Sequence, residues 1–367
     1  MSLEILIGAD AAPVALKNTV TKSSVSNRLL DGLEEVWSAA DARVISLASP
    51  LGSDPDAEAS QLESIVALSP AGVCLCGAHI LDLGAKGLSA VRAGLKEKHI
   101  APFGAGEDID EADQPFFYAK HGVRIGFYAI GEDGPSSATE RRAGSNPLDL
   151  INIGDRVREI KSNCDRLVVF YCGGMGGYPY PSPEVQRVCR KIAACGASLV
   201  ICQHGAGIGS REHWNSAEII YGQGAFLAAP ANGAGEGLLV RYIIGDYGAD
   251  KVEYVPIVSR DGCAALADQA KAAEMTEEFR KRSLRIRVEG FVGARFEAYA
   301  SEQKDRLTQV FFSRNPAFKP LSKLFGNKPT RGYPVESKAE ILNALRKESS
   351  RELIIRGLKQ DVQPAEN

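Results

Sequence analysis

Residues 167–205 read LVVFYCGGMGGYPYPSPEVQRVCRKIAACGASLVICQHG and contain a complete strand, helix and strand. The apolar run at 167–171 is typical of a buried strand. The Ser182-Pro183 pair marks a helix start, because Ser caps well and Pro fits the first helical position. Gly196 lies just past the expected helix end, and residues 199–202 form the next apolar run. This unit predicts an α/β fold.

The alternation of apolar runs with amphipathic stretches continues on both sides of this unit. Further strands are expected at residues 4–8, 44–47, 73–76, 219–221, 238–244 and 252–258, and helices at 29–40, 84–98 and 152–162. Two apolar runs, at 116–120 and 123–130, are separated only by His121-Gly122 and predict a hairpin. The sheets are therefore expected to be mixed.

The composition is that of an ordinary globular protein of 367 residues, with 44% hydrophobic and 24% charged residues. The net charge of −3 gives no reason to expect a nucleic-acid partner. The charge is uneven along the chain. Residues 261–367 carry 20 basic and 15 acidic residues, which leaves a net charge of −8 for residues 1–260. The sequence therefore predicts a domain over 1–260 and a mainly helical extension over 261–367.

One part of this extension, residues 311–335, holds five basic residues and no acidic residue. Aromatic residues interleave with the basic ones. A solvated or core-packed segment and a docking segment for an acidic partner surface both agree with this pattern. Residues 342–358 are expected to form an amphipathic helix.

The chain begins with a strand-like run and shows neither a signal peptide nor a transmembrane segment. Its eight cysteines lie inside apolar strand and helix patterns: Cys74, Cys76, Cys164, Cys172, Cys189, Cys195, Cys202 and Cys263. This placement is typical of reduced, buried thiols rather than of a disulfide framework. We therefore expect a cytoplasmic protein.

Polar residues follow several of the expected strands, where ligands usually bind in α/β sheets. Asp10 follows the first strand, His79 follows the strand near Cys76, Cys172 ends the strand at 167–171, and His204 follows the strand at 199–202. Topology predicts that these carboxylate, imidazole and thiol groups converge on one edge. Each has an ordinary alternative, because Asp caps turns, strand thiols fill cores and loop histidines are common.

The order of these motifs resembles the bacterial capsule synthesis protein CapA family across nearly the full length of the chain. The matching segments are residues 7–10, 46–51, 77–84, 103–106, 144–150, 172–176, 178–183, 204–206, 221–226 and 345–353. The most specific of them are NPLDL at 146–150 and YPYPSP at 178–183.

The resemblance implies a four-layer, metallophosphoesterase-like sandwich of two mixed β-sheets flanked by helices. It also implies a role in making a capsule or a poly-γ-glutamate-like surface polymer. Related enzymes activate water with two divalent metals. Only Asp10, His79 and His204 match the metal-ligand positions, and the other positions hold residues without the expected groups: Ala48, Ala78, Cys172, Gly176, Ala206 and Ala225. Two metals are therefore not expected.

Three functions agree with this pattern. The first is a ligand-binding or assembly subunit, whose ligand or partner is a surface-polymer precursor or another protein of the biosynthesis cluster. Residues Gly173, Gly174, Tyr180 and Gln203 are its candidate ligand-binding groups. The second is a repurposed hydrolase or transferase. The third is a family hydrolase with ligands outside the matched positions.

The repurposed enzyme has two versions. In one, Asp10, Cys172 and His204 hold a single Zn²⁺ or Mn²⁺ ion, with His79 as general acid or base. In the other, Cys172 is a nucleophile, with His79 or His204 as its base. Both versions need Cys172 as a thiolate.

Overall fold

The computed structural model describes residues 2–11, 29–47, 55–203, 207–227, 235–245, 250–260, 262–312 and 342. Its elements divide into two compact units, residues 1–293 and 294–367. The sequence-based boundary near residue 260 stays a prediction. Strand β16 and helix α8, which follow that boundary, belong to the first unit.

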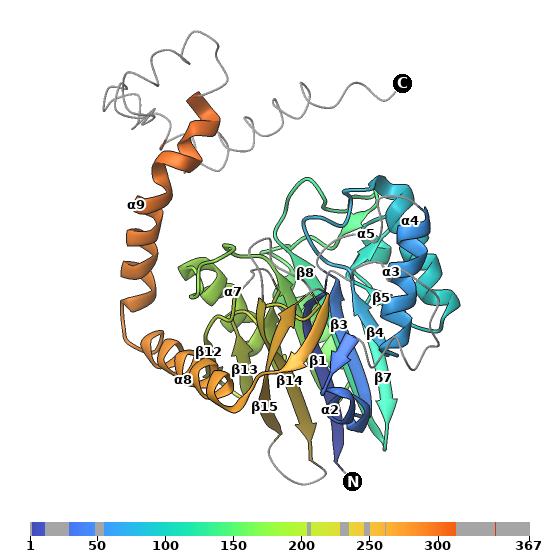
Figure 1. Cartoon of the computed structure of the whole chain (residues 1–367). Coiled ribbons are helices and arrows are strands. Elements are labelled where there is room, and N and C mark those ends of the chain that lie inside the picture. Colours follow the sequence, from blue (N-terminus) through green and yellow to red (C-terminus); the bar gives the residue numbers. More distant parts are fainter. Residues whose placement is uncertain are drawn as a thin grey trace. The chain divides into compact units, whose positions relative to one another are not determined.

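The larger sheet has eight strands among the described residues, in the order β2-β16-β15-β14-β1-β3-β4-β5 (Figure 1). Strands β1, β3, β4 and β5 run parallel, and β14, β15 and β16 are antiparallel additions. Its strands are β1 (Leu3–Ala11), β2 (Leu30–Asp31), β3 (Ala42–Leu47), β4 (Gly72–Cys74), β5 (Ala101–Phe103), β14 (Gly235–Ile244), β15 (Lys251–Arg260) and β16 (Cys263–Leu266).

The second sheet has six described strands in the order β12-β13-β11-β10-β8-β7. Its inner strands are parallel, and β7 and β12 pair antiparallel at the two edges. The strands are β7 (Phe116–Lys120), β8 (Val123–Gly131), β10 (Arg166–Cys172), β11 (Leu199–Cys202), β12 (Arg211–Trp214) and β13 (Ala217–Ile220). The β7–β8 hairpin confirms the prediction; its turn residues His121 and Gly122 both have positive φ, at 53° and 78°.

Helices cover the outer face of each sheet, which gives the expected four layers. Helices α2, α3 and α4 pack on the larger sheet, and α6 and α7 on the smaller one. The helices are α2 (Glu34–Ala39), α3 (Pro55–Ala67), α4 (Gly84–Glu97), α5 (Ile109–Ala112), α6 (Ile153–Lys161), α7 (Pro183–Ala194), α8 (Gln269–Arg285) and α9 (Phe291–Phe312). Strands β6 (Ala105–Gly106) and β9 (Gly144–Ser145) pair antiparallel as a separate small ribbon.

Alternating side chains of the strands build the core between the sheets. Phe127 and Phe170 of the smaller sheet meet Ile5 and Val44 of the larger sheet, and all four are fully buried. Burying one such side chain contributes roughly 1.5–3 kcal/mol. This layer therefore fixes the two sheets against each other.

Helix α7 begins as its sequence predicts. The Ser182 hydroxyl accepts a hydrogen bond from the Val185 N–H at 3.1 Å, and Pro183 occupies the first turn. Gly196, with φ of 119°, follows the helix end. Helix α7 packs on β11, β12 and β13.

The extension, expected to be mainly helical, contains the helices α8 and α9 and also one strand. Residues 263–266 form β16, which pairs with β15, because Cys263 and Ala265 alternate with Ala264 as strand residues do. Helix α8 then packs through Met275 and Phe279 against Ile208 and Leu238. The predicted helix at 342–358 and the basic segment, beyond its first two residues in α9, lie outside the described residues, Leu342 excepted.

Candidate functional site

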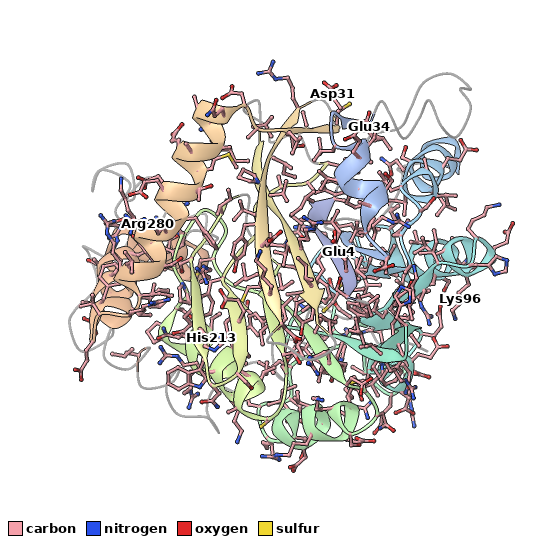
Figure 2. The ribbon with its side chains drawn as sticks, turned by 90° about the horizontal axis from the view of Figure 1, so that it is seen from below. Glu4, Asp31, Glu34, Lys96, His213 and Arg280 are labelled. Carbon is pink, nitrogen blue, oxygen red and sulfur yellow. The ribbon has the colours of Figure 1, made fainter. Side chains whose placement is uncertain are left out.

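A pocket of about 90 Å³ lies where β4, β8 and β10 end. The view in Figure 2 looks onto the opposite end of the sheets, where Glu4 lies near the start of β1. The pocket is lined by residues that follow these strands and by the loop that joins β8 to β9: Gly77, Ala78, Gly131, Glu132, Gly134, Pro135, Ser136, Ser137, Ser145, Cys172 and Gly173. Ligand binding beyond the carboxyl ends of strands was expected, and the pocket occupies that position.

Three thiols meet behind the pocket. Cys74, Cys76 and Cys172 are all buried in the core between the two sheets. Cys172 forms hydrogen bonds with both other thiols. The Cys76 Sγ also donates to the backbone oxygen of Asn146, 3.8 Å away. Cys76 and Cys172 thus lie together with Cys74, whereas Cys202, which also ends a strand, lies in another part of the core with its Sγ 3.6 Å from that of Cys189.

Burial holds these thiols in their neutral form. It raises the pKa of Cys74 well above its usual value, and the hydrogen bond with Cys172 and the charge of Asp10 add to the increase. The hydrogen bond from Cys74 favours the Cys172 thiolate, but the Cys76 hydrogen bond, burial and Asp10 outweigh it and raise the Cys172 pKa well above normal. An uncoordinated nucleophile needs the thiolate, so this environment opposes the nucleophilic role of Cys172.

Of the two predicted histidines, His79 is described, and it is exposed rather than buried with the thiols. The His79 side chain is 61% exposed, and its Nδ1 lies 3.0 Å from an oxygen of Asp82. His204 lies outside the described residues. Asp10 follows an irregularity in the β1–β3 register, and its backbone oxygen accepts a hydrogen bond from the Phe226 N–H at 3.0 Å. Its charge is near enough to act on Cys74 and Cys172.

Tyr180 and Gln203 have structural partners away from the pocket lining. The Tyr180 ring packs edge-on against Phe291, with centroids 5.1 Å apart, and its hydroxyl accepts from Arg285. The Gln203 side chain is 4% exposed and donates to Oε1 of Gln223 at 2.5 Å. Their predicted binding role stays a prediction, and these contacts give each residue a structural role.

Glu132 is a site residue that the sequence reasoning missed. It follows β8, and its Oε1 accepts hydrogen bonds from the Gly174 N–H at 3.0 Å and from the Tyr171 hydroxyl at 3.3 Å. A Cβ on Gly173 would come within 2.5 Å of the Glu132 side chain, so a larger residue there would displace Glu132 from its present position. The signal was present, because Gly131-Glu132 ends an apolar run like the other strand ends.

Three serines complete the pocket wall: Ser136 and Ser137 of the loop after β8, and Ser145 of β9. The Ser136 hydroxyl donates to the Ala78 backbone oxygen, and the Ser145 hydroxyl lies 3.2 Å from the Gly77 oxygen. The Ser137 hydroxyl accepts from the Gly134 N–H at 2.9 Å. These bonds tie the loop to the segment after β4 and hold both sides of the pocket together.

Comparison with known proteins agrees with this framework. Residues 7–230 match the family described as bacterial capsule synthesis protein PGA_cap. The chain belongs to this family. It is 26% identical over 211 residues to the capsule biosynthesis protein CapA of Bacillus anthracis. This match covers 54% of the chain and 51% of the relative, so the chain spans about half the length of the curated relative it matches.

Solved structures give weaker likenesses to this PGA_cap protein. A hypothetical protein from Thermus thermophilus is 13% identical, with a TM-score of 0.45, over 70% of this chain and 98% of the other. A 5'-nucleotidase precursor from the same organism is 12% identical, with a TM-score of 0.43, over 77% of this chain and 59% of the other.

The two-metal centre implied by the family resemblance does not fit the residues present at the described positions. Ala78, Gly176 and Ala225 carry no side-chain donor atom, and Cys172 supplies a single thiol. Within the described ranges, no three His, Cys, Asp or Glu side chains are arranged to hold an ion. The single Zn²⁺ or Mn²⁺ site of Asp10, Cys172 and His204 stays a prediction, since His204 lies outside those ranges.

Proposed function

We propose that this PGA_cap protein takes part in capsule or surface-polymer biosynthesis as a ligand-binding or assembly subunit without two-metal phosphoesterase chemistry. The observation that carries the proposal is the pocket itself. It occupies the strand ends at which the family resemblance implies metal ligands, but Ala78 and Cys172 line it there. The family membership supplies the biological context.

The pocket retains what a binding subunit needs. Its walls are joined by the Ser136–Ala78 and Glu132–Gly174 hydrogen bonds. A surface-polymer precursor is its proposed ligand, and another protein of the biosynthesis cluster is its proposed partner. The described helices include none that is long and apolar enough to cross a membrane. The eight cysteines all lie in the described ranges and form no disulfide there, which supports a location in the cytoplasm.

The alternative of a repurposed hydrolase or transferase finds less support. Its Cys–His version requires a Cys172 thiolate within reach of an imidazole, whereas the Cys76 hydrogen bond and burial outweigh the Cys74 hydrogen bond and raise the Cys172 pKa. His79 is turned toward Asp82 and exposed. No side-chain arrangement in the described part of the chain favours this alternative.

Deletion of the gene in the organism that carries it tests the biological role. We expect less surface polymer per cell, restored by the wild-type gene on a plasmid. An unchanged amount of polymer in the deletion strain would contradict the role.

Purified protein tests the absence of phosphoesterase chemistry. With Mn²⁺ and bis(p-nitrophenyl) phosphate, we expect no hydrolysis above the rate with metal alone. Hydrolysis that disappears in Asp10→Ala protein would instead assign the metal chemistry to this site.

A further inference from the structure

The pocket wall offers hydrogen-bond acceptors. A serine hydroxyl has one hydrogen and two lone pairs. The Ser136 hydrogen is directed to the Ala78 oxygen, and the Ser145 hydroxyl has two backbone acceptors, the Gly77 oxygen at 3.2 Å and the Ser136 oxygen at 3.1 Å. Both serines therefore present lone pairs rather than hydrogens to a ligand.

Glu132 adds a negative charge to these acceptors. Its Oε1 already binds the Gly174 N–H and the Tyr171 hydroxyl. No residue in the described ranges donates to its Oε2. None of the described residues that line the pocket is a Lys, Arg or His. An anionic ligand would thus meet a carboxylate without any cationic side chain from this lining.

We propose that the pocket binds a primary ammonium group. The inference rests on the proposed function and names the chemistry of the ligand at that site. An ammonium group has three donors and one positive charge, which match the Glu132 carboxylate and the Ser136 and Ser145 hydroxyl oxygens. Hydrogen bonds between an ammonium group and a carboxylate are about twice as strong as neutral ones.

The pocket takes only the head group of a larger molecule. Its volume of about 90 Å³ is small beside the roughly 300–1,000 Å³ of pockets that enclose a drug-sized ligand. The ligand is therefore an amine-bearing end or substituent, whose remaining part lies outside the pocket.

Three small probes of similar size separate the possible ligand classes. Ethanolamine carries an ammonium group, ethylene glycol carries only hydroxyls, and inorganic phosphate is an anion. Each is titrated into the full chain labelled with ¹⁵N-glycine. The amides of Gly131, Gly134, Gly173 and Gly174 report binding in or beside the pocket. We expect ethanolamine to shift these signals with an affinity at least tenfold above that of either other probe.

Two carboxylate variants locate the ammonium group. Glu132→Gln keeps the oxygen that binds Gly174 but removes the charge, and we expect at least a tenfold loss of ethanolamine affinity. Asp133→Asn removes the same charge from the adjacent exposed residue, which does not line the pocket, and we expect less than a twofold change. Should Glu132→Gln fail to fold, Ser136→Ala replaces it, with a loss of at least threefold.

Three results would overturn the inference. They are tighter binding of phosphate, equal binding of ethylene glycol and ethanolamine, and no shift of the pocket glycines with any probe. The inference and the proposed function fail separately. Ethanolamine binding with an unchanged surface polymer after gene deletion removes the function and keeps the ligand class. Loss of polymer after gene deletion, without ethanolamine binding, keeps the function and removes the ligand class.

Discussion

The side-chain amide of Gln203, just after β11, donates at 2.5 Å to Oε1 of Gln223, which follows β13 of the same sheet. Gln223 in turn donates from Nε2 to the backbone oxygens of Ile7 and Leu238, at 3.1 and 2.9 Å. Gln223 is 1% exposed. Because a buried polar group without a partner is costly, this amide pair contributes to how the two sheets meet beside the site.

We expect Gln223→Ala to lower the free energy of unfolding by about 2–4 kcal/mol, because it leaves Gln203 and two backbone oxygens without their partner. Urea denaturation of the purified chain measures this. In a double-mutant cycle, Gln203→Ala should cost less in the Gln223→Ala background than in the wild type. Additive costs would show that the two amides are energetically independent.

Asn146 has a similar bridging role at the pocket. Its Nδ2 lies within hydrogen-bond distance of Asp113, the Tyr128 hydroxyl and the Ala129 oxygen. We expect Asn146→Ala to lower the unfolding free energy by about 2–3 kcal/mol in urea. Asn163→Ala, which removes exposed hydrogen bonds to Glu159 and Ser162 at the end of a helix, is the control and should cost well under about 1 kcal/mol. Equal costs would contradict the bridging role.

The buried thiols should react slowly with iodoacetamide. The pKa of each of Cys74, Cys76 and Cys172 is raised, so the thiolate fraction at pH 8 falls below that of an ordinary thiol. Mass spectrometry should find these three unlabelled in native protein and labelled in denaturant. The half-buried Cys164 and Cys263 are internal references that react earlier. Rapid native labelling of Cys172 would reinstate it as a candidate nucleophile.

We expect Arg92 to contribute to the stability of the fold in a way that depends on pH. Its hydrogen bond to Glu111 lowers the pKa of that carboxyl, helped by the Glu107 N–H. Glu111 therefore binds its proton less tightly in the folded state than in the unfolded state. The stabilisation is present above the ordinary glutamate pKa of about 4.3 and is lost as the pH falls through the lowered folded value.

Replacing Arg92 with Met tests this dependence. The difference in unfolding free energy between wild type and Arg92→Met should shrink between pH 5 and about pH 3. Arg158→Met removes an arginine from an exposed pair with Asp155 and is the control, with a small effect at every pH. A difference for Arg92→Met that stays constant over this range would contradict the role of Glu111.

The fold followed from the sequence where local signals agree with tertiary structure. The strand–helix–strand unit around α7 and the β7–β8 hairpin carry their own caps and turns, and both are confirmed. Strand β16 has only four residues and depends on pairing with β15, so no local sequence pattern predicts it. Its existence is decided by the partner strand rather than by its own sequence.

The candidate site was predicted only in part for a related reason. Cys172 and Gly173 were found because they end an obvious buried strand. Glu132 was missed because β8 was expected in a hairpin with β7, whereas its parallel pairing with β10 brings its carboxyl end to the pocket. Sequence periodicity does not reveal which neighbour a strand takes. The orientation of His79 toward Asp82 is likewise set by its loop.

The most direct test of a binding role in polymer synthesis is to fill the pocket in living cells. Ala78→Phe places a ring in the lining, whereas Ala85→Phe places one on the exposed surface of α4 and is the matched control. Surface polymer is measured in the deletion strain that expresses each variant at equal protein level. Our account predicts that Ala85→Phe restores the polymer and Ala78→Phe does not. Full restoration by Ala78→Phe would contradict it.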